Sequence, residues 1–420
     1  MIDETIILLT PFEDCSHRLS KHIMGYLTVN VKFDLYWYKP LQRIFSKVIV
    51  YDYLRRTCEV GVKGANEEII DLVKREHPKY VLWLAWQYEF RESTFDVIRR
   101  EGTIVISWFG DDFFRFDNYC KWWIPYLDYC ITSDIEAVAK YRELGAKVIY
   151  TPGFSGIAVD RDWSNIKEEY DVSFVGSRTP DREQYINELK NRNISLHLAG
   201  RGWGKYVSYV PFEEMIDIFG SSKINLNFSW FEAANKMVVR GRVGEVCLAG
   251  GFLLTEYFPG IENYFEIDKE IVCFKNAEEM IDKIKYYLTH ESERRAIARA
   301  GWERATRQYT SFHLISNEFC QIEEDIAAKN KVSNRHPPKV KMPMQIRMRF
   351  SGYYLIWGMA FLLQNDKGLW KDALALSISY NPFSILARGG YIIGFLPLFM
   401  RSALINLFVK LHKALPLKIA

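Results

Sequence analysis

Glycine and arginine follow a predicted buried strand in the second half of the chain, in a pattern that suits phosphate binding. Gly176, Ser177 and Arg178 come directly after the β-rich run DVSFV, and Arg182 opens a helical pattern four residues after Arg178. A turn of this kind presents free backbone N–H groups to an anion, and a guanidinium binds phosphate through two parallel hydrogen bonds. The sequence therefore predicts a diphosphate site at this turn. The alternative is a surface arginine in an ordinary strand-to-helix turn.

A lone carboxylate lies in the glycine-rich segment NKMVVRGRVGEVCLAGGFLLTE (235–256). Glu245 follows Gly244 in a short predicted helix over residues 243–248 that leads into the buried strand FLLT. A carboxylate at a helix N-terminus accepts hydrogen bonds from backbone N–H groups or from the two hydroxyls of a ribose. The alternative role is a helix cap. Positive charge is added by Lys236, Arg240 and Arg242.

Familiar signatures of several enzyme classes are missing. The sequence contains no G-x-G-x-x-G after the first strand, no Walker loop, no H-E-x-x-H and no G-x-S-x-G. The eight His are scattered, and His17 and His22 are five residues apart, which is the wrong spacing for two ligands on one helix face. We therefore expect neither a metal site nor a cofactor.

Short apolar runs alternate with helical patterns through the first 330 residues, as in parallel, doubly wound sheets. Expected strands are TIILL (5–9), KVIVY (47–51), YVLWLAW (80–86), TIVISWF (103–109), YCIT (129–132), DVSFVGS (171–177), SLHLAG (195–200), INLNFS (224–229) and GFLLTE (251–256). Regular periodicity stops at about 148–170. We expect two Rossmann-like α/β domains facing a cleft, at residues 1–155 and 171–330, joined by a linker at 156–170.

Composition indicates a folded protein of more than one domain. The chain has 420 residues, of which 49% are hydrophobic and 25% charged, and its seven Cys form no C-x-x-C pair. The beginning, MIDETIILLTPFED, is acidic where a signal peptide is basic. These features favour a protein of the reducing cytoplasm.

Residues 331–420 form a basic, apolar tail on an acidic body. They hold 13 Lys or Arg and 2 Asp or Glu, a net charge of +11, whereas residues 1–330 hold 42 and 50, a net charge of −8. The apolar runs at 351–363 and 389–400 are too short to span a bilayer. We expect helices that lie on the anionic cytoplasmic face of a membrane. The alternative is a helical subdomain packed on the body or on a second subunit.

The second half resembles a known family. Residues 171–203, 221–229, 242–265 and 277–310 are similar to the nucleotide-sugar-binding half of CgeB-like glycosyltransferases, which have the GT-B fold. In the first half, WFGDD (108–112), YLDYCITSD (126–134) and YRELGAKVIYTPGF (141–154) follow the same family pattern.

The resemblance implies roles for particular residues. Glu245 matches the acid that binds the donor ribose, and Arg178 matches the basic position near the diphosphate. One departure concerns the E-x7-E motif of related retaining enzymes, because its first carboxylate is replaced by Met237. Glu232 is a nearby substitute, and the motif supports no statement about stereochemistry.

Sugar transfer requires stabilisation of the leaving diphosphate and, with inversion, a base for the acceptor proton. Asp111 and Asp112 follow a strand of the first domain, where ligands bind in parallel sheets, and Glu89 follows the preceding strand. Alternatively, one aspartate caps the next helix and the other pairs with Arg115. Several aromatic residues can stack on sugars or belong to the core: Trp83, Trp86, Trp108, Trp122, Trp123 and Trp230.

The sequence thus favours a metal-independent glycosyltransferase that moves a sugar from a nucleotide-diphosphate donor to a hydroxyl acceptor, in cell-surface glycan or polysaccharide biosynthesis. The acceptor would be a glycan or a lipid-linked glycan at the membrane. We expect no nucleic acid partner, and the protein could form a homo-oligomer. One alternative is a non-catalytic protein that only binds sugar nucleotides. An epimerase or a phosphorylase would share the fold, but we find no pyridoxal-binding lysine motif.

Overall fold

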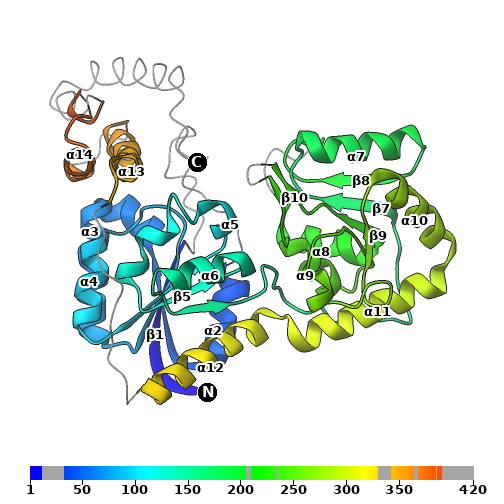
Figure 1. Cartoon of the computed structure of the whole chain (residues 1–420), viewed down its shortest axis with the longest axis horizontal. Helices are drawn as coiled ribbons and strands as arrows, with labels where there is room; N and C mark the ends of the chain where they lie inside the picture. Colours follow the sequence, from blue (N-terminus) through cyan, green and yellow to red (C-terminus); the bar gives the residue numbers. More distant parts are fainter. Residues whose placement is uncertain are drawn as a thin grey trace. The chain divides into compact units, whose positions relative to one another are not determined.

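A computed structural model describes residues 1–11, 33–204, 210–232, 235–329, 342–363, 368–384 and 386–389. The chain divides into two compact units, each considered by itself. Unit 1 comprises residues 1–33, 44–149 and 329–420, and unit 2 comprises residues 34–43 and 150–328. Each unit contains a sheet of parallel strands connected by helices (Figure 1). This confirms the predicted class of two doubly wound α/β domains with a helical C-terminal extension.

The sheet of unit 1 has six strands in the order β2-β1-β3-β4-β5-β6. The pairs of β1 with β2 and β3, and of β4 with β3 and β5, are parallel. The central strand β3 is buried at every residue, which explains its unbroken apolar sequence YVLWL. The strands are β1 (Ile2–Thr10), β2 (Phe45–Asp52), β3 (Tyr80–Leu84), β4 (Ile104–Phe109), β5 (Tyr129–Thr132) and β6 (Val148–Tyr150).

The helices of unit 1 follow these strands. They are α3 (Tyr53–Glu76), α4 (Glu92–Arg100), α5 (Asp112–Arg115) and α6 (Ile135–Glu143), with short 3-10 turns η3 (Cys120–Trp122) and η4 (Ile124–Tyr126). Asp52 caps α3 by accepting a hydrogen bond from the backbone N–H of Arg55 at 3.0 Å. The helix kinks at Gly61, whose φ is 78°. A Cβ at Gly61 would lie 3.2 Å from Leu369 of the C-terminal extension, so glycine permits this close approach.

The described part of the C-terminal extension packs on the rest of unit 1. It forms α13 (Met344–Leu363) and α14 (Leu369–Tyr380), and Trp357 and Leu374 are fully buried in the same core as β3. The ring of Phe350 stacks on Tyr380 with centroids 4.9 Å apart. Most of the apolar side chains of these two helices are covered by protein, although Met344 and Met348 are exposed. The two helices therefore match the alternative of a packed helical subdomain and not the predicted helices on a membrane surface. No helix in the described ranges is long and apolar enough to cross a membrane, and residues 390–420 lie outside those ranges.

The main sheet of unit 2 has five strands in the order β13-β12-β9-β7-β8, and all its pairs are parallel. The strands are β7 (Tyr170–Val175), β8 (Leu196–Ala199), β9 (Ser222–Asn227), β12 (Leu253–Glu256) and β13 (Val272–Phe274). A separate antiparallel hairpin joins β10 (Trp230–Phe231) to β11 (Lys236–Met237). The short strands β6 and β13 were not predicted, because three residues are too few to show a period.

The helices of unit 2 include a segment from early in the chain. They are η2 (Asp34–Tyr38), a π-helix, α2 (Lys39–Ile44), α7 (Pro180–Asn191), α8 (Phe212–Ser221), α9 (Gly241–Leu248), η6 (Ile261–Asn263), α10 (Ala277–Thr289), α11 (Glu291–Gln308) and α12 (Ser311–Lys329). Tyr36 meets Phe212 edge to face, and the guanidinium of Arg43 lies 3.8 Å from the ring centroid of Phe312. These contacts place residues 34–43 in unit 2, where the predicted boundaries had assigned them to the first domain.

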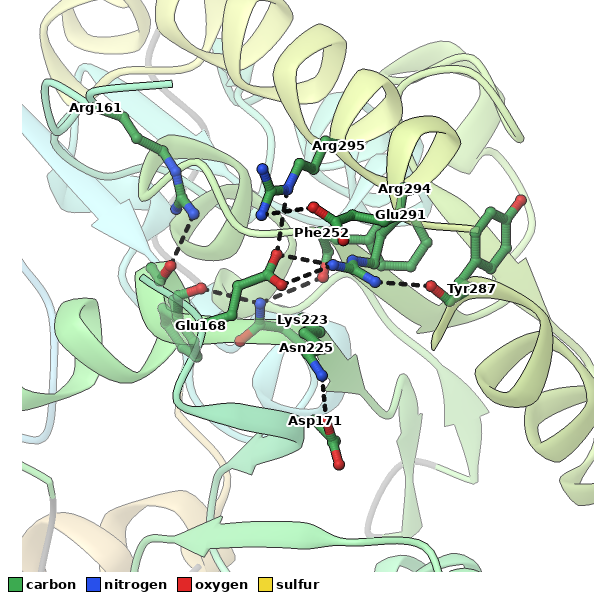
Figure 2. Close-up of polar contacts among 12 residues, drawn as sticks. Arg161, Glu168, Asp171, Lys223, Asn225, Phe252, Tyr287, Glu291, Arg294 and Arg295 are labelled. Atoms are coloured by element: carbon green, nitrogen blue, oxygen red, sulfur yellow. Dashed lines mark hydrogen bonds and ion pairs between the residues drawn. The ribbon is translucent and has the colours of Figure 1, made fainter. Parts of the chain in front are cut away.

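The predicted linker is held on unit 2 by a buried ion pair and by hydrogen bonds to backbone oxygens (Figure 2). Glu168 accepts hydrogen bonds from Arg294 of α11 at 2.8 and 2.9 Å, and Arg294 is only 2% exposed. Arg161 donates to the backbone oxygens of Gly220 and Ala249. Residues 156–170 therefore belong structurally to unit 2.

Candidate functional site

The sheet of unit 2 has a topological switch point. β7 lies between β8, which follows it in sequence, and β9, so the connections after β7 and β9 leave in opposite directions. In open parallel sheets, ligands bind outside the carboxyl ends of the strands at such a point. Here those ends are Val175 of β7 and Asn227 of β9, with Glu256 at the end of neighbouring β12.

The turn after β7 is tightly packed. The N–H of Gly176 donates to the backbone oxygen of Ala199 at 2.8 Å, and a Cβ at Gly176 would lie 2.7 Å from the ring of Phe174. Arg178 is half exposed, pairs with Glu183 and lies 5.6 Å from the ring of Trp203. The predicted arginine is thus present at the strand end, but it is engaged by a neighbouring carboxylate on α7.

Arg182 lies deeper than the sequence suggested. Its Nη1 donates to the backbone oxygen of Ser177 at 2.9 Å, while its Nε is buried and has no hydrogen-bond partner among the described residues. Burial lowers the pKa of Arg182, Asp181 opposes this, and the nearby charge of Arg242 lowers the pKa further. Arg242 also donates to a backbone oxygen at the end of β7, that of Val175, so two guanidinium groups are anchored at this edge, an arrangement that an anion would stabilise.

Glu245 joins this group through α9. Its Oε1 accepts a hydrogen bond from the hydroxyl of Tyr36 at 3.0 Å, and its Oε2 forms an ion pair with Arg242. The Nε of Arg242 also donates to the backbone oxygen of Val175 at the end of β7, at 3.0 Å. Glu245 lies in the second turn of α9, so it orders Tyr36 and Arg242 and does not cap the helix. Burial, followed by the charge of Glu245, raises the pKa of Tyr36, which therefore stays a hydrogen-bond donor.

A carboxylate has about four lone-pair sites, so Glu245 retains acceptor capacity beyond these two contacts. Its side chain is 12% exposed. A ligand hydroxyl can therefore approach Glu245 only along a narrow face.

Of the other predicted donor residues, Lys236 and Arg240 lie on or beside the β10–β11 hairpin, and Gly244 lies in α9. Arg240 donates to the backbone oxygen of Trp230 at 2.9 Å and lies over the ring of Phe231. Lys236 pairs with Phe231 across the hairpin. A Cβ at Gly244 would lie 2.8 Å from Phe154, so this glycine allows close packing of α9 on the segment after β6.

Met237, at the position of the missing first carboxylate, is half-buried in β11 and packs against a hydrophobic core of unit 2. Glu232, the nearby substitute, is exposed. Neither position 237 nor position 232 therefore contributes a buried carboxylate to the site.

Sequence reasoning missed Glu256, a buried acid at the end of β12. Its Oε2 accepts hydrogen bonds from the backbone N–H groups of Ser229 and Trp230 at 2.8 and 3.0 Å, and its Oε1 accepts one from Tyr185 at 3.2 Å. These contacts fix the loop that follows β9 at the switch point. The available signal was an acid ending an apolar strand, GFLLTE.

The carboxylates predicted in the first domain have different surroundings in unit 1. Asp112 is 1% exposed and accepts a hydrogen bond from Thr132, and burial raises its pKa to about 7. Glu89 is also buried, accepts from the N–H of Gln87, and has its pKa raised to about 7 by burial. Both are enclosed by protein. Asp111 is partly exposed at the N-cap position of α5 and lies close to the charge of Arg115, so it is the most accessible of the three carboxylates.

The structure therefore brings Arg182, Arg242, Glu245 and Glu256 to the carboxyl edge of unit 2, and Tyr36 with them. Arg178 lies at the rim, and Arg240, Lys236 and Gly244 support the hairpin and α9. Over the part of the chain that the structure describes, no group of three or more His, Cys, Asp or Glu is arranged to hold a metal ion.

Comparisons with known proteins cover this region. Residues 178–317 match the family described as Glycosyl transferase-like. The chain is 21% identical over 298 residues to spore protein CgeB of Bacillus subtilis (strain 168), a match that covers 62% of this chain and 91% of that protein.

Two solved structures are also similar. Anabaena HepE, in complex with UDP and glucose, is 9% identical, with a TM-score of 0.46 over 77% of this chain and 100% of that one. Sucrose-phosphate synthase from Thermosynechococcus elongatus is 9% identical, with a TM-score of 0.47 over 78% of this chain and 100% of that one. By the two sequence matches, residues 178–317 form a glycosyl transferase-like domain, and the chain is a distant homologue of spore protein CgeB.

Proposed function

We propose that the protein is a glycosyltransferase that uses a nucleoside-diphosphate sugar as donor and a hydroxyl group as acceptor. The observation that carries this proposal is that the guanidinium groups of Arg182 and Arg242 both donate to backbone oxygens at the carboxyl end of β7, those of Ser177 and Val175, and that Arg242 pairs with Glu245. They occupy the carboxyl edge of the sheet, within the segment that matches the glycosyl transferase-like family.

In this proposal Arg182 and Arg242 bind the diphosphate, and the positive end of α9 adds to their field. Charge developing on the departing nucleoside diphosphate is stabilised by these fixed groups without a metal ion. Glu245 accepts hydrogen bonds from the ribose hydroxyls while Tyr36 holds its carboxylate in place. When the donor binds, Arg178 at the rim breaks its ion pair with Glu183 and binds a phosphate oxygen instead. In unit 1, Asp111 accepts the acceptor proton if the reaction inverts the anomeric centre.

A thermal-shift panel of UDP, GDP, dTDP, CDP and ADP tests the donor site, with Mg²⁺ or EDTA in parallel. A nucleotide at about a hundred times its dissociation constant adds roughly 2.7 kcal/mol to the free energy of unfolding. We expect one nucleotide to stabilise the wild type equally in EDTA, and to lose its effect in Glu245→Gln.

The matched control is Glu303→Gln, which changes an exposed acid on α11 that pairs with Arg299. The proposal fails if no nucleotide shifts the wild type, or if Glu245→Gln responds as Glu303→Gln does.

A non-catalytic sugar-nucleotide-binding protein is the second candidate, and Met237 in place of a carboxylate favours it. Nucleotide binding without hydrolysis or transfer over a broad panel of sugar acceptors would support this candidate.

We further propose that residues 390–420 attach the protein to anionic membrane at the cytoplasmic face, where a lipid-linked glycan acceptor would be found. This segment holds four Lys or Arg and no Asp or Glu. Deleting it should release the protein from vesicles that contain anionic lipid. Unchanged binding of the shortened chain to those vesicles would reject the attachment.

A further inference from the structure

Unit 1 contains a cavity of about 240 Å³ that the donor site does not use. Three segments line it: residues 86–88 after β3, residues between 111 and 119 in and after α5, and Arg349 of α13. The first two segments follow the carboxyl ends of neighbouring parallel strands, Leu84 and Phe109. The cavity thus occupies the edge at which parallel α/β sheets bind ligands, and the C-terminal extension completes its wall.

Basic residues predominate among the charged residues that line this cavity. Arg115 and Arg349 contribute two guanidinium groups, and Asp111 contributes one carboxylate. Both arginines lie near the hydroxyl of Tyr88: burial raises the pKa of Tyr88, and the charges of Arg349 and Arg115 oppose this rise. Among the residues that line the cavity, guanidinium groups therefore outnumber carboxylates two to one, and guanidinium groups favour an oxyanion as ligand.

Two uncharged groups suit a sugar ring. Trp86 lines the cavity and is 36% exposed, an unusual exposure for so large an aromatic side chain. Asn118 also lines the cavity, and its Oδ1 is buried without a hydrogen-bond partner among the described residues. A ligand hydroxyl can donate to this oxygen and remove the cost of leaving it unsatisfied.

We propose that this cavity binds the acceptor and selects a saccharide with an oxyanion, either a carboxylate or a phosphate. Arg349 and Arg115 bind the oxyanion, the face of Trp86 packs on the ring, and Asn118 accepts a hydrogen bond from a ring hydroxyl. The inference rests on the proposed function in naming the ligand an acceptor. It gives α13 a role in substrate selection, because Arg349 belongs to that helix.

Saturation-transfer NMR titrations of the full-length protein with glucuronic acid, glucose 6-phosphate and glucose test this proposal. We expect at least one charged sugar to bind the wild type about tenfold more tightly than glucose, and the identity of that sugar decides between carboxylate and phosphate. Arg349→Gln should abolish the preference. The matched control is Arg347→Gln on the same helix, whose guanidinium donates to the backbone oxygen of Ser379 and does not line the cavity.

Trp86→Leu should weaken binding of charged and neutral sugars alike, and as a change at a partly exposed side chain it leaves the fold intact. The proposal is overturned if the charged sugars bind the wild type no better than glucose, or if Arg349→Gln retains the preference. Nucleotide stabilisation is measured on the same variants. If no nucleotide stabilises the wild type, the donor site is rejected. The proposal for this cavity would still be tested by the preference for charged sugars.

Discussion

The α12 helix carries a carboxyl group that should make the stability of unit 2 depend on pH. Glu318 is 3% exposed, and its Oε2 has no hydrogen-bond partner among the described residues. Burial raises the pKa of Glu318 to about 8 from 4.5, against a smaller opposing effect of a hydrogen bond with Thr151. The folded protein therefore holds this proton over a range in which the unfolded chain has released it.

The sign follows from this difference. Below the unfolded pKa the group has no effect on the free energy of unfolding, and between pH 4.5 and about 8 it costs progressively more stability. At about 1.4 kcal/mol per pH unit, the cost grows by about 3 to 4 kcal/mol between pH 5 and pH 8. Glu318→Gln cannot ionise, so relative to the wild type it should gain that much stability over this range.

Urea denaturation of both proteins at pH 5, 6, 7 and 8, followed by tryptophan fluorescence, measures this gain. The control is Glu303→Gln, because that acid is exposed in its ion pair with Arg299. A stability difference between wild type and Glu318→Gln that is the same at pH 5 and pH 8 would refute the reasoning.

Two further substitutions test contacts within unit 2. Glu168→Ala leaves the buried charge of Arg294 unpaired and should lower the free energy of unfolding by about 3 kcal/mol in urea denaturation. The control Asp171→Ala breaks an exposed ion pair and should lower it by less than about 1 kcal/mol. Equal losses would contradict the argument from burial. Tyr36→Phe removes one hydrogen bond to the carboxylate of Glu245 and should weaken nucleotide binding about tenfold in calorimetric titration, and unchanged affinity would show that Tyr36 does not order the site.

Much of the fold could be predicted because buried parallel strands are nearly unbroken apolar runs, separated here by helical patterns. The strand YCIT was predicted with the observed bounds of β5, and YVLWLAW contains β3. The packing of the C-terminal extension could not be predicted, because the sequence of an apolar helix such as α13 does not show whether protein or lipid covers it. The decisive contacts, such as that of Gly61 with Leu369, join residues far apart in the chain.

Part of the candidate site could be located in the sequence, and its assignment as a donor site stays a prediction. Arg182 could be found because it lies in the first turn of a helix that follows a strand end, where ligands of parallel sheets bind, and Glu245 because it is a lone acid in a glycine-rich segment. Tyr36 could not, since it is 209 residues from Glu245 and no local pattern connects them. Asp112 was predicted as a catalytic candidate from its position alone, but its neighbour Thr132 and its burial depend on how the chain folds around it.

Hydrogen–deuterium exchange with and without the stabilising nucleotide tests the central claim most directly, because it locates the bound nucleotide on the chain. The account predicts slower exchange in peptides that cover residues 176–182 and 240–248, with little change in peptides from residues 342–363. Protection confined to unit 1, or the same protection in Glu245→Gln, would contradict the assignment of the donor site to the carboxyl edge of unit 2.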